Sequence, residues 1–140
     1  MGLQAAFHPR GAILRGAILL CTALAGCSGG PVPPPLHPVK GTVMKAGQAV
    51  SAGTLQFRSD LEPPLTTLAD IAPDGSFMAA TLFNDRRLPG ARPGPYRITV
   101  ILAGGADGRS FTPIDVDQTF TVEAKENYFT IDVSKAKKSP

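Results

Sequence analysis

The chain has 140 residues, with 14 Lys and Arg against 11 Asp and Glu and a formal net charge of +3. This basic excess is too small to indicate a nucleic-acid-binding protein, whereas 43% hydrophobic residues are enough for a packed core. With 15 glycines and 14 prolines, the composition favours short strands joined by turns over long helices.

The first 26 residues have the features of an export signal. Arg10 and Arg15 supply positive charge, and an apolar or small stretch runs from Gly16 to Gly26. A helix needs about 20 apolar residues to cross a bilayer, so this shorter stretch predicts a signal-peptide core rather than a permanent membrane span. We therefore expect residues 1–26 to be removed on export.

The signal ends in a motif that resembles the bacterial lipobox, Leu24-Ala25-Gly26-Cys27. The resemblance implies that the Cys27 thiol receives a diacylglycerol and that a peptidase cleaves the chain before Cys27. An ordinary secretory signal with an incidental Cys is the alternative. In the sorting pattern of Gram-negative lipoproteins, a residue such as Ser28 after the Cys favours the outer membrane. We expect an exported protein, lipid-anchored at the periplasmic face of that membrane.

Cleavage before Cys27 would leave one lipidated Cys and therefore no pair for a disulfide. It would also remove both arginines of the signal, leaving 12 basic and 11 acidic groups and a net charge of +1. Residues 27–36 are rich in Gly and Pro, and a proline run favours extended polyproline II. We expect this segment to be a tether, with a proline-rich ligand for a partner as the alternative.

From residue 37 onward, apolar and polar residues alternate between turn signals with the period of two that is typical of β-strands. The alternation predicts seven strands, at 39–43, 53–58, 66–72, 76–82, 95–102, 114–123 and 129–133. Residues 73–76, Pro-Asp-Gly-Ser, predict a turn that closes a hairpin between the third and fourth strands. Loops are expected at 84–94 and 103–113, and a basic disordered tail at 135–140.

Seven short strands over residues 37–134, without helical periodicity, predict an all-β, immunoglobulin-like two-sheet sandwich. A small barrel is the alternative. The inward-facing side chains should form the core between the sheets, with Gln118 as a polar exception. These expected core residues are Phe57, Phe77, Tyr96, Ile98, Val100, Phe120, Phe129 and Ile131.

Three segments together resemble carboxypeptidase-regulatory-like domains, which read V-x-G-x-V, D-G-x-F and P-G-x-Y-x-V-T-V in this order. The matching segments are 39–43 (followed by Gly47 and 53–57), 74–77 and 92–100. The family often has Thr-Asp before its D-G hairpin, where this chain has Ile-Ala-Pro at 71–73, so no role of that Asp transfers. With the lipobox and the tether, the chain resembles short planctomycete lipoproteins. The resemblance covers 37–133 and implies a transthyretin-like or immunoglobulin-like sandwich without catalysis of its own.

Candidate catalytic and metal-binding groups are few. The single His of the mature chain, His37, lies at the tether boundary, where a structural role is favoured over that of a catalytic base. The Cys and His ligands of a zinc site are lacking. A calcium site would have to come from Asp107, Asp115 and Asp117, for which a solvated acidic face is the favoured alternative. We therefore expect no enzymatic activity, no cofactor and no metal.

Ligand binding is the alternative to a purely structural role. Tyr128 is the sole candidate platform for a sugar, although a core-edge Tyr is the favoured interpretation. Arg86 and Arg87 in the 84–94 loop are candidates to contact an acidic partner or a lipid headgroup, unless the loop is simply solvated. The sequence predicts a non-enzymatic, lipid-anchored β-sandwich of the bacterial cell envelope that interacts with an envelope protein or glycan. The alternative is a glycan- or peptide-binding module acting through loops 84–94 and 103–113.

Overall fold

The computed structural model describes residues 29–104 and 110–138. The predicted signal 1–26, the predicted lipidation residue Cys27 and the candidate ligand Asp107 lie outside these ranges. The chain divides into a unit of residues 1–31 and a unit of residues 32–140, and all the strands belong to the second unit. In the described ranges, no helix has the length and apolar character needed to cross a membrane.

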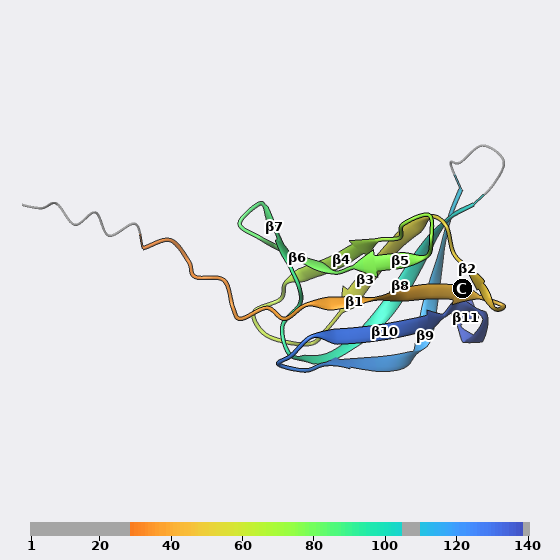
Figure 1. Cartoon of the computed structure of the whole chain (residues 1–140). Helices are drawn as coiled ribbons and strands as arrows, with labels where there is room; N and C mark the ends of the chain where they lie inside the picture. The colour runs from red at the N-terminus through yellow and green to blue at the C-terminus, as the bar shows by residue number, and fades with distance from the viewer. Residues whose placement is uncertain (1–28, 105–109, 139–140) are drawn as a thin grey trace, which may run out of the picture. The chain divides into compact units, whose positions relative to one another are not determined.

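Two β-sheets form the second unit, which confirms the predicted all-β sandwich (Figure 1). The smaller sheet has the order β10 (Asn127–Asp132), β1 (Val39–Lys45), β2 (Gln48–Ala49), with β5 (Ser76–Met78) also paired to β1. The larger sheet has the order β11 (Lys137–Lys138), β9 (Ser110–Val122), β8 (Gly94–Gly104), β3 (Gly53–Arg58), β4 (Thr66–Asp70), β6 (Ala80–Phe83), β7 (Arg86–Pro89). A short 3-10 helix (Val133–Lys135) separates β10 from β11. Strands β1 and β10 run parallel to each other. Every other pair of neighbouring strands named here is antiparallel.

The alternation of apolar side chains places them in the space between the sheets. Seven of the eight residues predicted for the core are buried, with exposed fractions between 0% and 6%. The eighth, Phe129, is partly buried and packs against Phe120 with ring centroids 5.1 Å apart. Buried side chains of both sheets, among them Val43, Leu55 and Val122, complete one core. Burial of this apolar area is the main stabilising contribution to such a fold.

The segment predicted as one strand at 76–82 forms two strands that belong to different sheets. Strand β5 pairs with β1, whereas β6 pairs with β4. Buried Ala79 lies between them: its N–H donates to Val39 O, and its carbonyl accepts from Gly90 N. The predicted hairpin of 66–72 with 76–82 is present, since β4 pairs with β6 and Ile71 is bridged to Phe77 in the same register. Its pairing is interrupted between these pairs, where β5 is paired with β1 instead.

Residues 84–94 were predicted to be an irregular loop, and this prediction is wrong for their first half. Strand β7 pairs with β6 in a tight hairpin, whose turn residues Asn84 and Asp85 have φ angles of 48° and 58°. Asn and Asp tolerate this left-handed conformation, which suits two-residue hairpin turns. Pro89 is compatible with a strand here because β7 is an edge strand and not every N–H has to donate to a neighbour.

Other boundaries also differ from the prediction, and the described residues contain eleven strands where seven were predicted. Strands β8 and β9 leave only residues 105–109, outside the described ranges, of the loop predicted at 103–113. The tail predicted to be disordered at 135–140 contains β11, in which Lys137 pairs with Asp115. A two-residue strand is too short to show a period. Gln118 is exposed because the register between β8 and β9 shifts next to it.

The predicted turn before β5 is present and is held by a side chain. Gly75 has a φ of 85°, which glycine adopts without strain. Asp74 Oδ1 accepts hydrogen bonds from Ser76 Oγ at 2.6 Å and from Ser76 N at 3.0 Å. These bonds lower the pKa of Asp74, with the hydroxyl as the largest cause.

This turn should make the stability of the protein depend on pH in the acidic range. Because the pKa of Asp74 is lower in the folded than in the unfolded chain, its contribution is present above the unfolded pKa and is lost as the pH falls through the folded value. We expect the Tm to fall as the pH drops below about 4, and to fall less in Ser76→Ala, which lacks the hydroxyl donor. Thermal unfolding at a series of pH values measures this, and identical pH profiles would contradict it.

Candidate functional site

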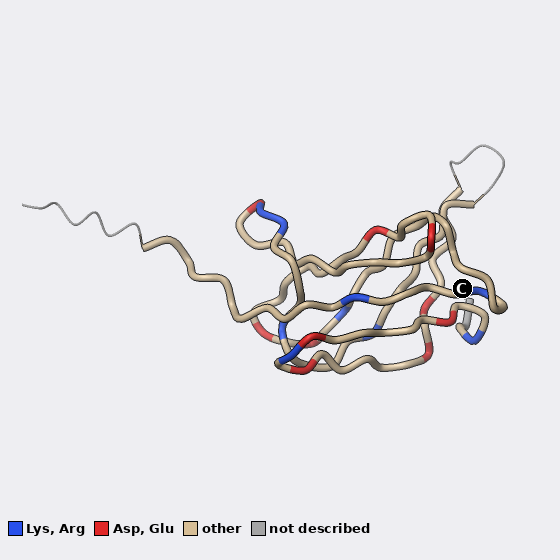
Figure 2. The backbone as a smooth tube through the Cα atoms, in the orientation of Figure 1, with Lys and Arg blue, Asp and Glu red and all other residues tan. Residues whose placement is uncertain are grey.

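Arg86 and Arg87, two of the predicted binding residues, begin β7 at the edge of the larger sheet. Arg87 Nη2 lies 2.9 Å from Asp70 Oδ2, with both side chains largely exposed. Arg86 is exposed and pairs with Phe83 in the hairpin. Figure 2 shows basic and acidic segments interspersed along the described backbone, including this hairpin. The hairpin therefore carries charges of both signs rather than a basic patch.

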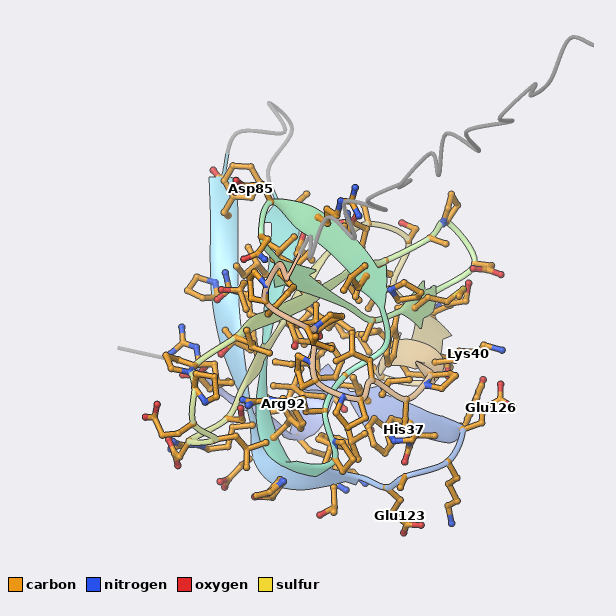
Figure 3. All side chains as sticks on the ribbon, turned by 90° about the vertical axis from the view of Figure 1, so that its left-hand side faces the viewer. His37, Lys40, Asp85, Arg92, Glu123 and Glu126 are labelled. Carbon is orange, nitrogen blue, oxygen red and sulfur yellow. The ribbon has the colours of Figure 1, made fainter. Side chains whose placement is uncertain are left out.

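Tyr128, the predicted platform, is not a core-edge residue but is 67% exposed on β10. In the register of the smaller sheet it lies beside Lys40 of β1, which in turn lies beside Met78 of β5. Met78 is 60% exposed. Lys40 Nζ contacts Glu126 Oε1 at 2.6 Å and lowers the pKa of that carboxyl (Figure 3). Tyr128, Lys40 and Met78 thus form a row across the outer face of this sheet.

Asp115 and Asp117 are both exposed on β9, with buried Val116 between them. Asp115 Oδ1 accepts a hydrogen bond of 2.6 Å from Thr99 Oγ1. The third predicted calcium ligand, Asp107, lies outside the described residues. In the part of the chain that the structure describes, no three His, Cys, Asp or Glu side chains are grouped so that they could hold a metal ion.

The segment around His37 fixes the start of the sandwich (Figure 3). His37 N donates to Ala91 O at 2.9 Å, and Ala91 N donates to His37 O at 3.0 Å. Arg92, which follows Ala91 in the sequence, is only 9% exposed, and its guanidinium donates to the carbonyl oxygens of Leu61 and Glu62. These contacts give His37 a structural position through its main chain, and they tie the loop after β3 to the same end of the sandwich.

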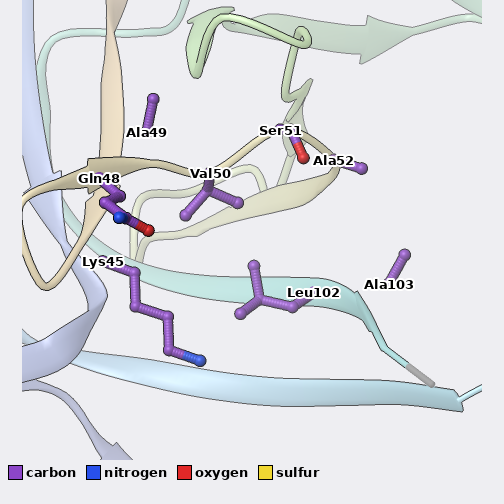
Figure 4. A pocket seen from close by; sticks show the side chains of 8 residues that line it. All are labelled: Lys45, Gln48, Ala49, Val50, Ser51, Ala52, Leu102 and Ala103. Atoms are coloured by element: carbon purple, nitrogen blue, oxygen red, sulfur yellow. The ribbon is translucent and has the colours of Figure 1, made fainter. Parts of the chain in front are cut away.

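One hollow of about 260 Å³ opens where the chain passes from the smaller to the larger sheet (Figure 4). Val50 and Leu102, partly buried against the core, give it apolar surface, and Lys45 and Gln48 supply polar groups. The remaining lining residues are Ala49, Ser51, Ala52 and Ala103. Its volume is slightly below the usual range of about 300–1,000 Å³ for ligand pockets.

A second hollow of about 130 Å³ lies where β3 ends and β8 begins. Its lining residues are Arg58, Ser59, Asp60, Pro95, Tyr96, Arg97 and Thr119. The phenol of Tyr96 donates to Arg92 O at 3.0 Å, and burial raises the pKa of Tyr96. Neither hollow includes Tyr128, Arg86 or Arg87, so the structure does not bring the three predicted binding residues together in either of them.

Sequence reasoning missed the basic pair of this second hollow. This pair consists of Arg58 and Arg97. Both are polar residues at strand positions opposite the core, where charged residues are common. The signal appears only when the register pairs β3 with β8, because this pairing places Arg58 directly opposite Arg97.

Comparison with known proteins does not identify a family. No protein family model matches the chain. No curated protein matches it. A crystal structure of a DUF3823 family protein from Parabacteroides merdae is similar, with 20% sequence identity and a TM-score of 0.46. The match covers 71% of this chain and 46% of that chain, so this chain spans about half the length of that protein.

Proposed function

We propose that this protein is a non-enzymatic, lipid-anchored β-sandwich of the bacterial cell envelope that acts as a structural or interaction module. The observation that carries the proposal is the position of the fold relative to the lipobox. His37, the first residue bonded into the sandwich, follows Cys27 by only ten positions. Even fully extended, about ten residues span at most about 35 Å. A lipid on Cys27 would therefore hold the sandwich close to a membrane.

The resemblance to carboxypeptidase-regulatory-like domains of planctomycete lipoproteins belongs to this proposal. Its V-x-G-x-V segment is β1, the central strand of the smaller sheet. Gly41, the glycine of that motif, lies where β1 meets Phe129 of β10 and the ring of Phe77. The motif residue thus has a packing reason in this fold, which supports the resemblance. We propose the outer membrane as the site of anchoring because Ser28 follows the lipobox.

The described carboxylates with shifted pKa values support a structural rather than a catalytic role. Hydrogen bonds from Ser76 and Ser134 lower the pKa values of Asp74 and Asp132, and Lys40 lowers that of Glu126. A carboxyl that acts as a general acid near neutral pH needs the opposite shift, a raised pKa in a dry pocket. These groups stabilise turns and a cross-strand pair instead.

A glycan- or peptide-binding module is the second candidate function. Exposed Tyr128 favours it, because an aromatic ring with an apolar face and a polar tip is a good contact surface. The row of Tyr128, Lys40 and Met78 places this surface on the outer face of the smaller sheet, rather than in the loops at 84–94 and 103–113. This candidate differs from the first in requiring a ligand that contacts Tyr128.

The anchor is tested by replacing Cys27. We expect wild-type protein, expressed in a Gram-negative host and grown with a fatty-acid analogue, to incorporate the label, and Cys27→Ser to incorporate none. The lipoprotein peptidase should also leave the signal of this variant uncleaved. Cys21→Ser is the matched control, because it changes the other Cys of the signal region and should keep the label. Equal label in wild type and Cys27→Ser would refute the anchor.

A further inference from the structure

Two arginines lie directly opposite one another on the outer face of the larger sheet. The register of β3 and β8 pairs Arg58 with Arg97. Like charges at directly opposed positions of antiparallel strands are destabilising. Arg97 Nη2 is 3.7 Å from Asp60 Oδ1, a long contact between side chains that are 71% and 94% exposed. Within the described residues Arg58 forms no ion pair, so one acidic group faces two cations.

The hollow between these residues has the size and the donors for one small anionic group. Its volume of about 130 Å³ is well below that of a pocket for a whole drug-sized ligand. Ser59 and Thr119 add hydroxyl groups, and Thr119 lies opposite Arg97 in the pairing of β8 with β9. The planar guanidinium group donates two parallel hydrogen bonds to phosphate oxygens. Two arginines and Asp60 leave one positive charge, which a phosphate monoanion would balance.

We propose that this hollow, the Arg58–Arg97 site, binds a phosphate group. Both guanidinium groups would donate to its oxygens, and the hydroxyls of Ser59 and Thr119 would complete the set of donors. Binding would relieve the repulsion between the two arginines, so the anion and the folded sheet would stabilise each other. The inference does not depend on the lipid at Cys27.

The location of the Arg58–Arg97 site allows two sources of phosphate. Arg92 holds the carbonyl of Leu61, in the loop that follows Arg58, and the neighbouring Ala91 is bridged to His37. The site therefore lies toward the end of the sandwich from which the tether leaves. A phospholipid headgroup and a free phosphate ion are both reachable there, and they present the same oxygens to the arginines.

Titration of the full-length protein with two soluble probes tests the site. Inorganic phosphate represents the free anion, and glycerophosphoglycerol represents a headgroup phosphodiester without acyl chains. We expect saturable shifts of the arginine Nε–H resonances in NMR spectra, and an affinity at least about tenfold lower in Arg58→Gln and in Arg97→Gln. Lys45→Gln, which removes one positive charge at the other hollow, should bind as the wild type does. Tighter binding of the diester would assign the site to headgroups, and tighter binding of inorganic phosphate to the free ion.

A thermal measurement separates binding from a structural role of the arginines. Without phosphate, Arg58→Gln should raise the Tm slightly because it removes the cross-strand repulsion. Added phosphate should raise the Tm of the wild type and of Lys45→Gln, but not that of Arg58→Gln. Equal shifts with chloride at the same ionic strength, or equal responses of all the variants, would overturn the proposal, because they indicate general screening.

Discussion

Replacing Gly41 by alanine is expected to destabilise the sandwich by more than about 3 kcal/mol or to prevent folding. A Cβ atom at this position would overlap the carbonyl oxygen of Phe129 and lie 2.8 Å from Cε1 of Phe77. The first obstacle is backbone of the parallel partner strand, which cannot turn aside as a side chain does. Relief would require β1 and β10 to separate. Since a domain of this size has only about 5–15 kcal/mol of stability, the variant should approach the unfolding threshold.

Gly104→Ala provides the matched control for this prediction. Gly104 is also in a strand, and the nearest described atom to a Cβ there, Ser110 O, would be 3.7 Å away, which is an ordinary contact. We expect the free energy of unfolding of this variant to lie within about 1 kcal/mol of that of the wild type, because alanine removes the entropic disadvantage of glycine in a strand. Urea titration of both variants measures the difference. Similar midpoints for Gly41→Ala and the wild type would show that β1 and β10 do not approach as described.

Truncation of Phe120 to alanine is expected to cost about 3–5 kcal/mol of the free energy of unfolding. Its side chain is 6% exposed and contacts the ring of Phe129, with centroids 5.1 Å apart and ring planes at 50°. Alanine would leave a cavity between β9 and β10. The cavity and the lost ring contact both reduce stability.

The control for Phe120 is its neighbour on the same strand. Thr121 is exposed, and its pairing with Pro95 places it on the opposite face of β9. We expect Thr121→Ala to change stability by less than about 0.5 kcal/mol. The two variants together test the strand register, since a slip of one residue would exchange the two faces. Equal losses of stability in a denaturant titration would contradict the register.

The functional surface was less predictable than the core. Tyr128 could be selected from the sequence because it breaks the pattern of inward aromatic residues, and the structure shows it exposed. Arg86 and Arg87 were selected as loop residues, but the local φ angles of Asn84 and Asp85 turn that loop into a hairpin. Arg58 could not be selected, because a single outward arginine on a strand has no distinguishing feature before its partner strand is known.

The alternation of side chains by itself determined which residues of this protein face the core, because the period of two is a property of each strand alone. Tyr96, Ile98 and Val100 are buried wherever β8 pairs, so the sequence predicts them directly. Only the tertiary structure decided which strands are neighbours. Ala79 carries no local signal of a change of sheet, yet its N–H donates to Val39 of β1 and its carbonyl accepts from Gly90, the residue after β7. Pairing depends on contacts between residues that are distant in sequence, and the same holds for the opposition of Arg58 and Arg97.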